Sequence, residues 1–384
     1  MYEKTKTLLD DMEINEDPRT LVKDLSIAIR QMIEITRAIS ANAKVLVLDE
    51  PTSSLTEAEI RTLFRLIRKL KERDVSMFYI SHRLEEVFQI GDRVTIMRDG
   101  AKVSTCLVSE TNMSRIIEGI AGRQIDNLYP HVRRKSGECI FEVRNLAGSK
   151  FRDISIKAHA GEIVGISGLM GAGRSEVMRA CFGIDDYESG EVLVCGKRVP
   201  KKSTEKAARM GLCLLPEDRK NEGLALYLAV RENTVISNLK ELFPSGIYKK
   251  KTAAKVTEEY VNRLKIATPS IEKLVNYLSG GTQQKIVVAK WLMSKSKVFI
   301  FDEPTRGIDV GAKTDIYELM DILVESGAAI VMISSDLPEV LGMSDRIYVM
   351  SQGAIVGEFD AKDADQNTIL QYAFGQKNAK AVTA

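Results

Sequence analysis

The fold is decided by two neighbouring stretches of sequence, LSGGTQQK at residues 278–285 and VFIFDEPTRGID at residues 298–309. The first stretch leads into a helix predicted over residues 282–294. The start of a helix offers unpaired N–H groups and the positive end of the helix dipole, and glycine lets the backbone approach an anion without obstruction from a Cβ. The first stretch therefore predicts a helix start that binds a phosphate group, with residues 279–281 at its tip.

The second stretch predicts a buried parallel strand that ends in two carboxylates. Residues 298–301 are four consecutive apolar residues between breakers, which is typical of a strand covered on both faces. Asp302 and Glu303 follow at its carboxyl end. In P-loop ATPases the first such carboxylate serves Mg²⁺ and the second can polarise the attacking water. Either stretch alone could be a plain turn or a helix cap, but their order and spacing favour nucleotide chemistry.

The composition is that of a folded protein without an electrostatic preference for nucleic acid. The chain has 384 residues, of which 44% are hydrophobic, and a net charge of +2. This length predicts two or three domains, and so balanced a charge gives no basis for binding nucleic acid or an anionic membrane. No apolar run reaches the roughly 18 residues that span a bilayer. We expect a chain that is soluble or is held at a membrane by a partner.

The five cysteines have neither the spacing of a metal site nor that of a disulfide framework. This pattern indicates a reducing compartment and predicts that all five are small core residues. They are Cys106, Cys139, Cys181, Cys195 and Cys213.

The sequence contains an internal repeat. Three pairs of positions carry it, namely LS at residues 25 and 278, DEPT at residues 49 and 302, and glycine at residues 100 and 353. Each pair differs by 253 residues, and the register is ungapped over residues 25–103. The repeat therefore predicts two copies of one α/β fold. His82 of the first copy corresponds to Ser335 of the second.

The second copy contains a predicted phosphate loop. GLMGAGRS at residues 168–175 lies between a strand predicted over residues 162–167 and a helix predicted over residues 174–182. Successive N–H groups of such a strand–loop–helix unit form a nest for an anion, although arginine stands here where lysine is usual. The repeat would put the corresponding loop of the first copy before Met1. We therefore expect the back part of one domain and the whole of another.

The predicted domain boundaries follow from the repeat. They are the C-terminal part of a first ATPase domain at 1–122, a linker at 123–138, a complete second ATPase domain at 139–376 and a tail at 377–384. Residues 1–19 show no periodicity. The basic linker is expected to be a solvated surface, and His131 and His159 receive no role. Residues 230–269 have helical character and predict a helical subdomain.

Together these motifs resemble the ATP-binding subunits of bacterial ABC importers for monosaccharides, the ribose, galactose and xylose type. The matching segments are GLMGAGRS, LSGGTQQK and DEPTRGID, with PEDR at residues 216–219 and SSDLPE at residues 334–339. The resemblance implies an α/β fold, the P-loop NTPase cassette, with a mixed sheet core and a helical subdomain, in one partial and one complete copy. It implies ATP and Mg²⁺ as cofactors and ATP hydrolysis that energises sugar import.

The resemblance also implies roles for single residues. Catalysis is expected at Glu50, His82 and Glu303, and Mg²⁺ is expected at Asp49, Ser175 and Asp302. His82 follows a strand that ends beside DEPT, where a histidine can reach the γ-phosphate or the attacking water. The residues expected to bind ATP are Gly168, Gly171, Gly173, Arg174, Ser175, Glu217, Ser279, Gly280 and Gly281.

In this family two cassettes are thought to face each other, so that each ATP lies between the phosphate loop of one and the LSGG tip of the other. The loop at residues 168–175 would then face LSIAI at residues 25–29, which lacks both glycines. Arg174, Glu217 and Ser335 replace the usual lysine, glutamine and histidine. We therefore expect a chain that binds ATP but hydrolyses it slowly.

The implied partners are a transmembrane sugar permease and, indirectly, a periplasmic or extracellular sugar-binding protein. A second ATPase chain could supply the missing phosphate loop, and nucleic acid is not expected as a partner. The implied location is peripheral, on the cytoplasmic face of the cell's inner membrane. Two alternatives stay open, a tandem ABC protein that transports nothing and an inactive nucleotide-binding remnant of a truncated gene. The genes beside this one would discriminate between them.

Overall fold

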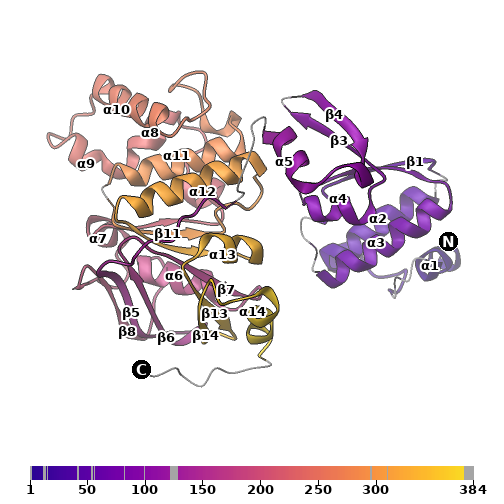
Figure 1. Cartoon of the computed structure of the whole chain (residues 1–384), viewed down its shortest axis with the longest axis horizontal. Coiled ribbons are helices and arrows are strands. Elements are labelled where there is room, and N and C mark those ends of the chain that lie inside the picture. Colours follow the sequence, from indigo (N-terminus) through magenta and orange to yellow (C-terminus); the bar gives the residue numbers. More distant parts are fainter. Residues whose placement is uncertain are drawn as a thin grey trace. The chain divides into compact units, whose positions relative to one another are not determined.

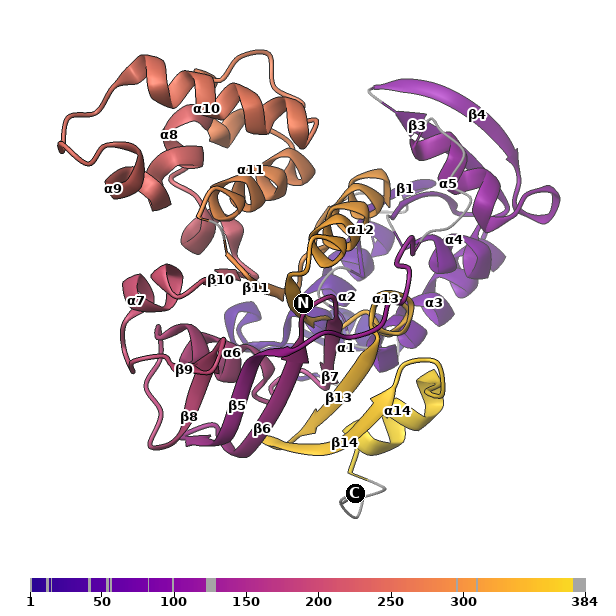
Figure 2. The same cartoon turned by 60° about the vertical axis from the view of Figure 1, so that its left-hand side comes forward.

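The computed structural model describes residues 2–375 except 12, 13, 15, 41, 42, 53, 54, 56, 82, 99, 122–128, 295 and 309. The chain divides into two compact units, unit 1 at Met1–Ile125 and unit 2 at Asp126–Ala384. Each has its own hydrophobic core. Figures 1 and 2 show the helices and strands of both units.

Unit 2 is built on a six-stranded sheet with the order β10-β11-β12-β7-β13-β14. All neighbours are parallel except β13 and β14, which form an antiparallel hairpin. Every residue of β11 and β12 is buried, as a parallel sheet covered on both faces requires. The strands are β7 (Ile163–Gly168), β10 (Leu212–Leu215), β11 (Val298–Asp302), β12 (Ala329–Ile333), β13 (Arg346–Ser351) and β14 (Ala354–Asp360).

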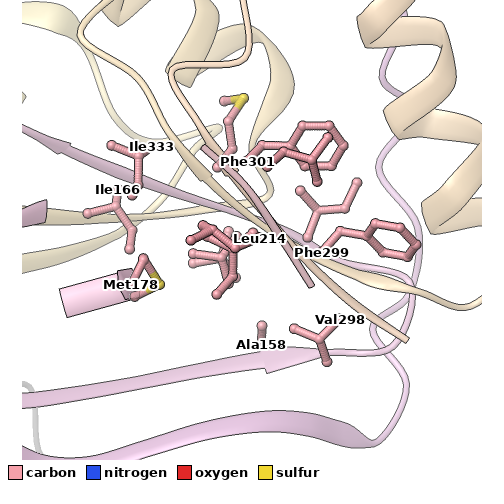
Figure 3. Close-up of a cluster of buried hydrophobic side chains, with 14 of the residues drawn as sticks. Ala158, Ile166, Met178, Leu214, Val298, Phe299, Phe301 and Ile333 are labelled. Carbon is pink, nitrogen blue, oxygen red and sulfur yellow. The ribbon is translucent and has the colours of Figure 1, made fainter. Parts of the chain in front are cut away.

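A second sheet of unit 2 is antiparallel, with the order β6-β5-β8-β9. Its strands are β5 (Cys139–Gly148), β6 (Phe151–His159), β8 (Ser189–Val194) and β9 (Lys197–Arg198). Figure 3 shows how the core joins the two sheets, because Ala158 of β6 and Met178 lie in one cluster with Leu214, Val298 and Ile333.

The helices of unit 2 are α6 (Arg174–Phe182), α7 (Thr204–Arg209), α8 (Val230–Val235), α9 (Leu239–Leu242), α10 (Lys250–Arg263), α11 (Gly280–Leu292), α12 (Val310–Glu325), α13 (Leu337–Met343) and α14 (Gln366–Ala373). Figure 2 shows α8, α9 and α10 gathered beside α11, away from β5, β6 and β8. The helical character predicted from residue 230 onward is thus present. None of the helices that the structure describes is long and apolar enough to cross a membrane.

Unit 1 repeats the second half of unit 2. Its elements are α1 (Tyr2–Asp11), α2 (Ile27–Ser40), β1 (Val45–Asp49), α3 (Glu57–Glu72), β2 (Ser76–Ile80), α4 (Leu84–Ile90), β3 (Arg93–Arg98), β4 (Ala101–Leu107) and α5 (Met113–Ala121). The bounds of β1 to β4 are those of β11 to β14 less 253 residues, and α3 and α4 correspond in the same way to α12 and α13. The irregularity of the hairpin also recurs, at Ile96/Met97 and at Val349/Met350.

The structure contains one helix for which nothing was predicted, and it contradicts two expectations at least in part. Residues 2–11 form α1, which packs through buried Leu9 into the core of unit 1. Among the cysteines only Cys181 and Cys213 are buried, whereas Cys139 and Cys195 are exposed and Cys106 is intermediate. Cysteine composition alone does not tell whether the strand end or turn that carries the residue is covered.

The second contradicted expectation concerns part of the basic linker, at His131 and Arg134. The ring nitrogens Nδ1 and Nε2 of His131 lie 2.9 Å from Asp321 Oδ1 and 3.1 Å from Asp345 Oδ1, and the His131 side chain is 1% exposed. Arg134 donates to both carboxylate oxygens of Asp321, at 2.7 and 2.8 Å. His131 and Arg134 are therefore held by partners far away in the sequence and are not a solvated surface, whereas residues 132, 133 and 135–138 are exposed as expected.

Candidate functional site

The central strand β7 leads directly into the glycine-rich loop. The φ angles of Gly168, Gly171 and Gly173 are 154°, 80° and 93°, a region that favours glycine. A Cβ at Gly168 would collide with the carbonyl oxygen of Met350, so the loop needs glycine to leave the sheet. At Gly171, no described atom lies within 4 Å of where a Cβ would be. The loop therefore has an open side.

Helix α6 begins at the end of this loop. The first N–H groups of a helix have no partner inside the helix, and its dipole is positive at that end. α6 is nine residues long, and Gly173 precedes its first residue. The open side of the loop and the start of α6 thus fit the phosphate groups of a nucleotide.

Ser175 and Asp302 join the loop to the neighbouring part of the sheet. The Ser175 hydroxyl donates a hydrogen bond of 3.0 Å to Asp302 Oδ1. Burial raises the pKa of Asp302, which is only 4% exposed, to about 6. Mg²⁺ in nucleotide sites is usually held by one or two protein oxygens together with phosphates and water. The hydroxyl and the carboxylate are a donor set of that kind.

Arg174 extends across the carboxyl ends of β11 and β12. Its Nη1 donates to the carbonyl oxygen of Ser334 at 2.7 Å, and its Nη2 donates to Glu303 Oε1 at 3.5 Å. Ser335 donates through Oγ to the other carboxylate oxygen of Glu303 at 3.0 Å. Both oxygens of Glu303 therefore have protein partners, whereas a general base has to face water.

The backbone holds Glu303 in an uncommon conformation. Its φ is 46°, and its N–H donates to the carbonyl oxygen of Ile333 at 2.9 Å. Glu50 of unit 1 repeats both features, with a φ of 45° and a 2.9 Å bond to Ile80. A positive φ is rare outside glycine. Both copies thus turn the glutamate in the same way after the strand.

A buried carboxylate behind the site was missed by sequence reasoning. Glu339, 1% exposed, accepts hydrogen bonds from the hydroxyls of Thr305, at 3.0 Å, and Ser334. In unit 1, Glu86 accepts in the same way from Thr52 at 3.0 Å and Ser81 at 2.9 Å. The signal was available, because all three residue types recur at the 253-residue offset.

Replacing Glu339 by glutamine is expected to make unit 2 less sensitive to pH. Burial raises the pKa of Glu339 from its usual 4.5 to about 7. A raised pKa means that this group stabilises the fold below about pH 4.5 and that this contribution is lost as the pH rises through 7. Between pH 4.5 and 8 the unchanged chain should lose about 3 kcal/mol more stability than Glu339→Gln. Urea unfolding across this range measures the difference, and equal slopes would contradict it.

A second cluster contains two more of the predicted residues of unit 2, Glu217 and Gly280. Glu217 forms an ion pair with Arg306. Arg219 donates to the carbonyl oxygens of Arg306 at 3.1 Å and Gly307 at 3.4 Å. A Cβ at Gly280 would lie 2.6 Å from Nη2 of Arg219. Arg219 thus links the PEDR segment to the loop after β11 and to the start of α11.

The glycines of LSGG have a packing role that the sequence did not reveal. Ser279 is the N-cap of α11, and its Oγ accepts from the N–H of Thr282 at 3.3 Å. Gly281 is buried, and a Cβ there would lie 2.5 Å from Cβ of Ala312. Gly281 is therefore needed for close packing between α11 and α12.

The structure brings some of the predicted residues together and separates others. The phosphate loop, Arg174, Ser175, Asp302 and Glu303 form one connected group. Glu217 and Gly280 belong to the Arg219 cluster. Asp49 and Glu50 lie in unit 1, at the end of β1 and directly after it. His82 is outside the described residues.

A glycine-rich loop between a parallel strand and a helix, with its serine bonded to a buried aspartate on another strand, defines a P-loop nucleotide-binding cassette. The family described as ABC transporter matches residues 1–53 and 151–306. The chain therefore belongs to the ATP-binding proteins of ABC transporters, and the predicted resemblance and the α/β cassette fold are confirmed.

Two relatives illustrate the similarity. The chain is 48% identical over 353 residues to the ribose import ATP-binding protein of Bacillus subtilis. That alignment covers 92% of this chain and 72% of the relative. It is 45% identical over 386 residues to the xylose import ATP-binding protein of Thermoanaerobacter pseudethanolicus. That alignment covers 98% of this chain and 76% of the relative.

Solved structures share the fold. One is an ATP-binding cassette of an ABC transporter in its ADP conformation, with a TM-score of 0.52 and 23% identity over 62% of this chain and 99% of that chain. Another is a cassette bound to ADP and phosphate, with a TM-score of 0.52 and 19% identity. The match covers 58% of this chain and 99% of that chain.

Proposed function

We propose that the chain binds and hydrolyses ATP to energise import of a monosaccharide of the ribose or xylose kind through a membrane permease. The observation that carries this proposal is the connected group of phosphate loop, Ser175 and Asp302 in unit 2. The import role is supported by the high identity to ribose and xylose import proteins. In this role the chain is peripheral on the cytoplasmic face of the membrane, and a sugar-binding protein delivers the sugar to the permease.

The residues of unit 2 would divide the work as follows. The N–H groups of residues 168–175 hold the phosphates, and Ser175 and Asp302 hold Mg²⁺. Bound Mg²⁺ neutralises charge on the phosphates. Glu303 would orient the attacking water only if its carboxylate were released, and in the chain alone Arg174 and Ser335 hold both of its oxygens. Glu217 and residues 279–281 would also bind the nucleotide, and Glu217 and Gly280 connect them to the Arg219 cluster.

We further propose that unit 1 is the back part of a first cassette, in which Asp49 serves Mg²⁺ and Glu50 and His82 serve catalysis. Residues 1–384 contain one glycine-rich phosphate loop, so the loop and the Glu50 group stand in different units. In unit 2, both oxygens of Glu303 are held by protein partners. The chain by itself should therefore bind ATP and hydrolyse it slowly.

Nucleotide binding and turnover by the purified chain test this proposal. Mg²⁺-dependent binding of a fluorescent ATP analogue is expected, and its absence would contradict the function. Steady hydrolysis should stay well below about 1 s⁻¹, the low end of ordinary enzymes. Faster turnover would contradict the prediction that hydrolysis is slow, but it would not contradict the proposed function. The import role is tested by whether the neighbouring genes encode a permease and whether that permease co-purifies with the chain.

Replacing Glu303 by glutamine should change the hydrolysis rate by less than about twofold, because its carboxylate is already engaged by Arg174 and Ser335. In a working site the loss of one transition-state group costs about a hundredfold to a thousandfold. Phosphate release under saturating Mg-ATP measures the effect. Ser175→Ala is the control, because it should weaken Mg²⁺-dependent binding. A large loss of rate in Glu303→Gln would mean that unit 2 is catalytically competent.

A further inference from the structure

Glu339 connects the two loops that surround the carboxylate of Glu303. Its Oε1 accepts a hydrogen bond from the hydroxyl of Thr305 at 3.0 Å, and its Oε2 accepts one from the hydroxyl of Ser334. Thr305 lies in the loop after β11, two residues beyond Glu303, whereas Ser334 directly follows β12. Each carboxylate oxygen of Glu339 therefore holds a different loop.

This connection is buried and lies beside the groups that hold Glu303. Its three side chains are no more than 3% exposed, so water does not compete for their hydrogen bonds. The backbone carbonyl of Ser334 accepts from Arg174, and the next residue, Ser335, donates to Glu303. The two side chains that occupy the oxygens of Glu303 thus both depend on where the backbone at residues 334 and 335 lies.

Two further hydrogen bonds complete the arrangement. The N–H of Glu303 donates to the carbonyl oxygen of Ile333 at 2.9 Å, which joins the ends of β11 and β12 through their backbones. The hydroxyl of Ser334 also accepts from the N–H of Asp336 at 3.0 Å, which fixes the turn that contains Ser335. Removing the carboxylate of Glu339 would leave that hydroxyl free to rotate and would loosen this turn.

The same connection recurs in unit 1. Glu86, which is 4% exposed, accepts at Oε2 from the hydroxyls of Thr52 at 3.0 Å and Ser81 at 2.9 Å. Its surroundings differ, because the hydroxyl of Tyr79 also donates to Glu86 at 2.7 Å, where unit 2 has Met332. The bridge between the two loops is thus kept in both copies although a neighbouring side chain has changed.

We propose that Glu339 is a positioning residue of the unit 2 site. By fixing the hydroxyls of Thr305 and Ser334, it keeps Glu303 within reach of the two side chains that donate to it. A carboxylate held by two donors does not face the attacking water. The inference rests on the proposed function of unit 2, and it adds that this connection is one cause of slow hydrolysis.

Breaking the connection should release Glu303 and raise the rate of hydrolysis. Glu339→Met keeps the length of the side chain and removes both acceptors, so the loops after β11 and β12 can move apart. The rate at saturating Mg-ATP should rise at least about threefold, because a general base that can reach water contributes about a hundredfold or more. A residue that only stabilises the fold would lower the rate when it is replaced.

Two comparisons show whether the rise comes from Glu303. Adding Glu303→Gln to Glu339→Met should abolish the rise, because no carboxylate is left to orient water. Glu339→Gln should keep the rate of the unchanged chain, because an amide can accept from one hydroxyl and donate to the other. A rise that survives Glu303→Gln, or one that Glu339→Gln shows in full, would overturn the inference.

A milder variant keeps the test decisive if Glu339→Met does not fold. Thr305→Val removes one hydroxyl and should raise the rate about twofold, since one of the two hydrogen bonds of the bridge is lost. Thr257→Val is the matched control on α10. Thr257 is 0% exposed, and its hydroxyl has no hydrogen-bond partner in the described part of the chain. Equal rates for these two variants would contradict the proposed role.

Amide hydrogen exchange tests the positioning without hydrolysis. The N–H groups to follow are those of Glu303 and Asp336, which are bonded to Ile333 and to the Ser334 hydroxyl. In Glu339→Met they should exchange at least about tenfold faster, whereas the amides of residues 163–166 in β7 should be unchanged. Equal acceleration at both places would mean that Glu339 only stabilises the fold.

Binding of Mg-ATP is measured in the same samples, so that the two proposals can fail separately. Normal binding without the rise in rate would overturn the inference and leave the proposed function standing. Absence of binding by the unchanged chain would contradict the proposed function and the inference with it.

Discussion

ATP affinity is expected to fall about a hundredfold when Arg174 is replaced by alanine. The guanidinium is the cation of the connected group, 10% exposed, and it reaches both Ser334 and Glu303. Without it the carboxylates of Asp302 and Glu303 face a triphosphate with no compensating charge from the loop. A hydrogen bond to a charged group contributes about 1.5–3 kcal/mol, and about 3 kcal/mol corresponds to a hundredfold change in affinity. Titration with a fluorescent ATP analogue measures it.

Two variants control this prediction. Arg174→Lys keeps the charge and loses the two-pronged contact, so its affinity should stay within about tenfold of the unchanged chain. Arg179→Ala lies on the same helix, where Arg179 pairs with Asp185 and Glu222, and it should bind ATP normally. Normal ATP binding by Arg174→Ala would show that the loop amides and Mg²⁺ suffice.

The largest loss of stability is expected from Gly165→Ala in the central strand. A Cβ at Gly165 would collide with Oγ of Ser344 and would lie 2.9 Å from Cγ1 of Val340. Gly165 and both neighbours are buried, so the structure cannot yield without moving α13 away from β7. Overpacking of this kind costs about 3 kcal/mol. The midpoint of urea unfolding measures the cost.

A double variant tests the cause of that loss. Adding Ser344→Gly removes the nearest obstructing atom and should restore at least about 1 kcal/mol, since residues in contact are coupled. Gly246→Ala is the matched control, with a φ of 73° and no described atom within 4 Å of the added Cβ. It should cost only about 1 kcal/mol of backbone strain. An equal cost at both positions would contradict the steric explanation.

Much of the fold could be predicted because its signals are local. The strand before the phosphate loop and α6 were predicted within a residue of their bounds, since apolar periodicity and glycine positions act over a few residues. The helix α1 was missed because its first residues are mostly polar. The partners of His131 were missed because Asp321 and Asp345 are distant in the sequence.

The candidate site divides in the same way. The sequence was sufficient to select Ser175, Asp302 and Glu303, because their residue types and spacing are those of phosphate and Mg²⁺ chemistry. The state of Glu303 was not predictable, since it depends on where Arg174 and Ser335 point. The hidden carboxylate Glu339 became meaningful only when the structure brought Thr305 and Ser334 to it.

The sequence by itself determined the family, the phosphate loop and the 253-residue repeat, because each is a pattern of residue types at fixed spacing. Only the tertiary structure decided that Arg174 donates a hydrogen bond to Glu303. It also decided that the repeated strands are exposed in unit 1 and buried in unit 2. Val47 and Ile300 occupy the same place in the same fold, yet one is 61% exposed and the other is buried. Burial depends on what packs against a strand, and that contact comes from residues far away along the chain.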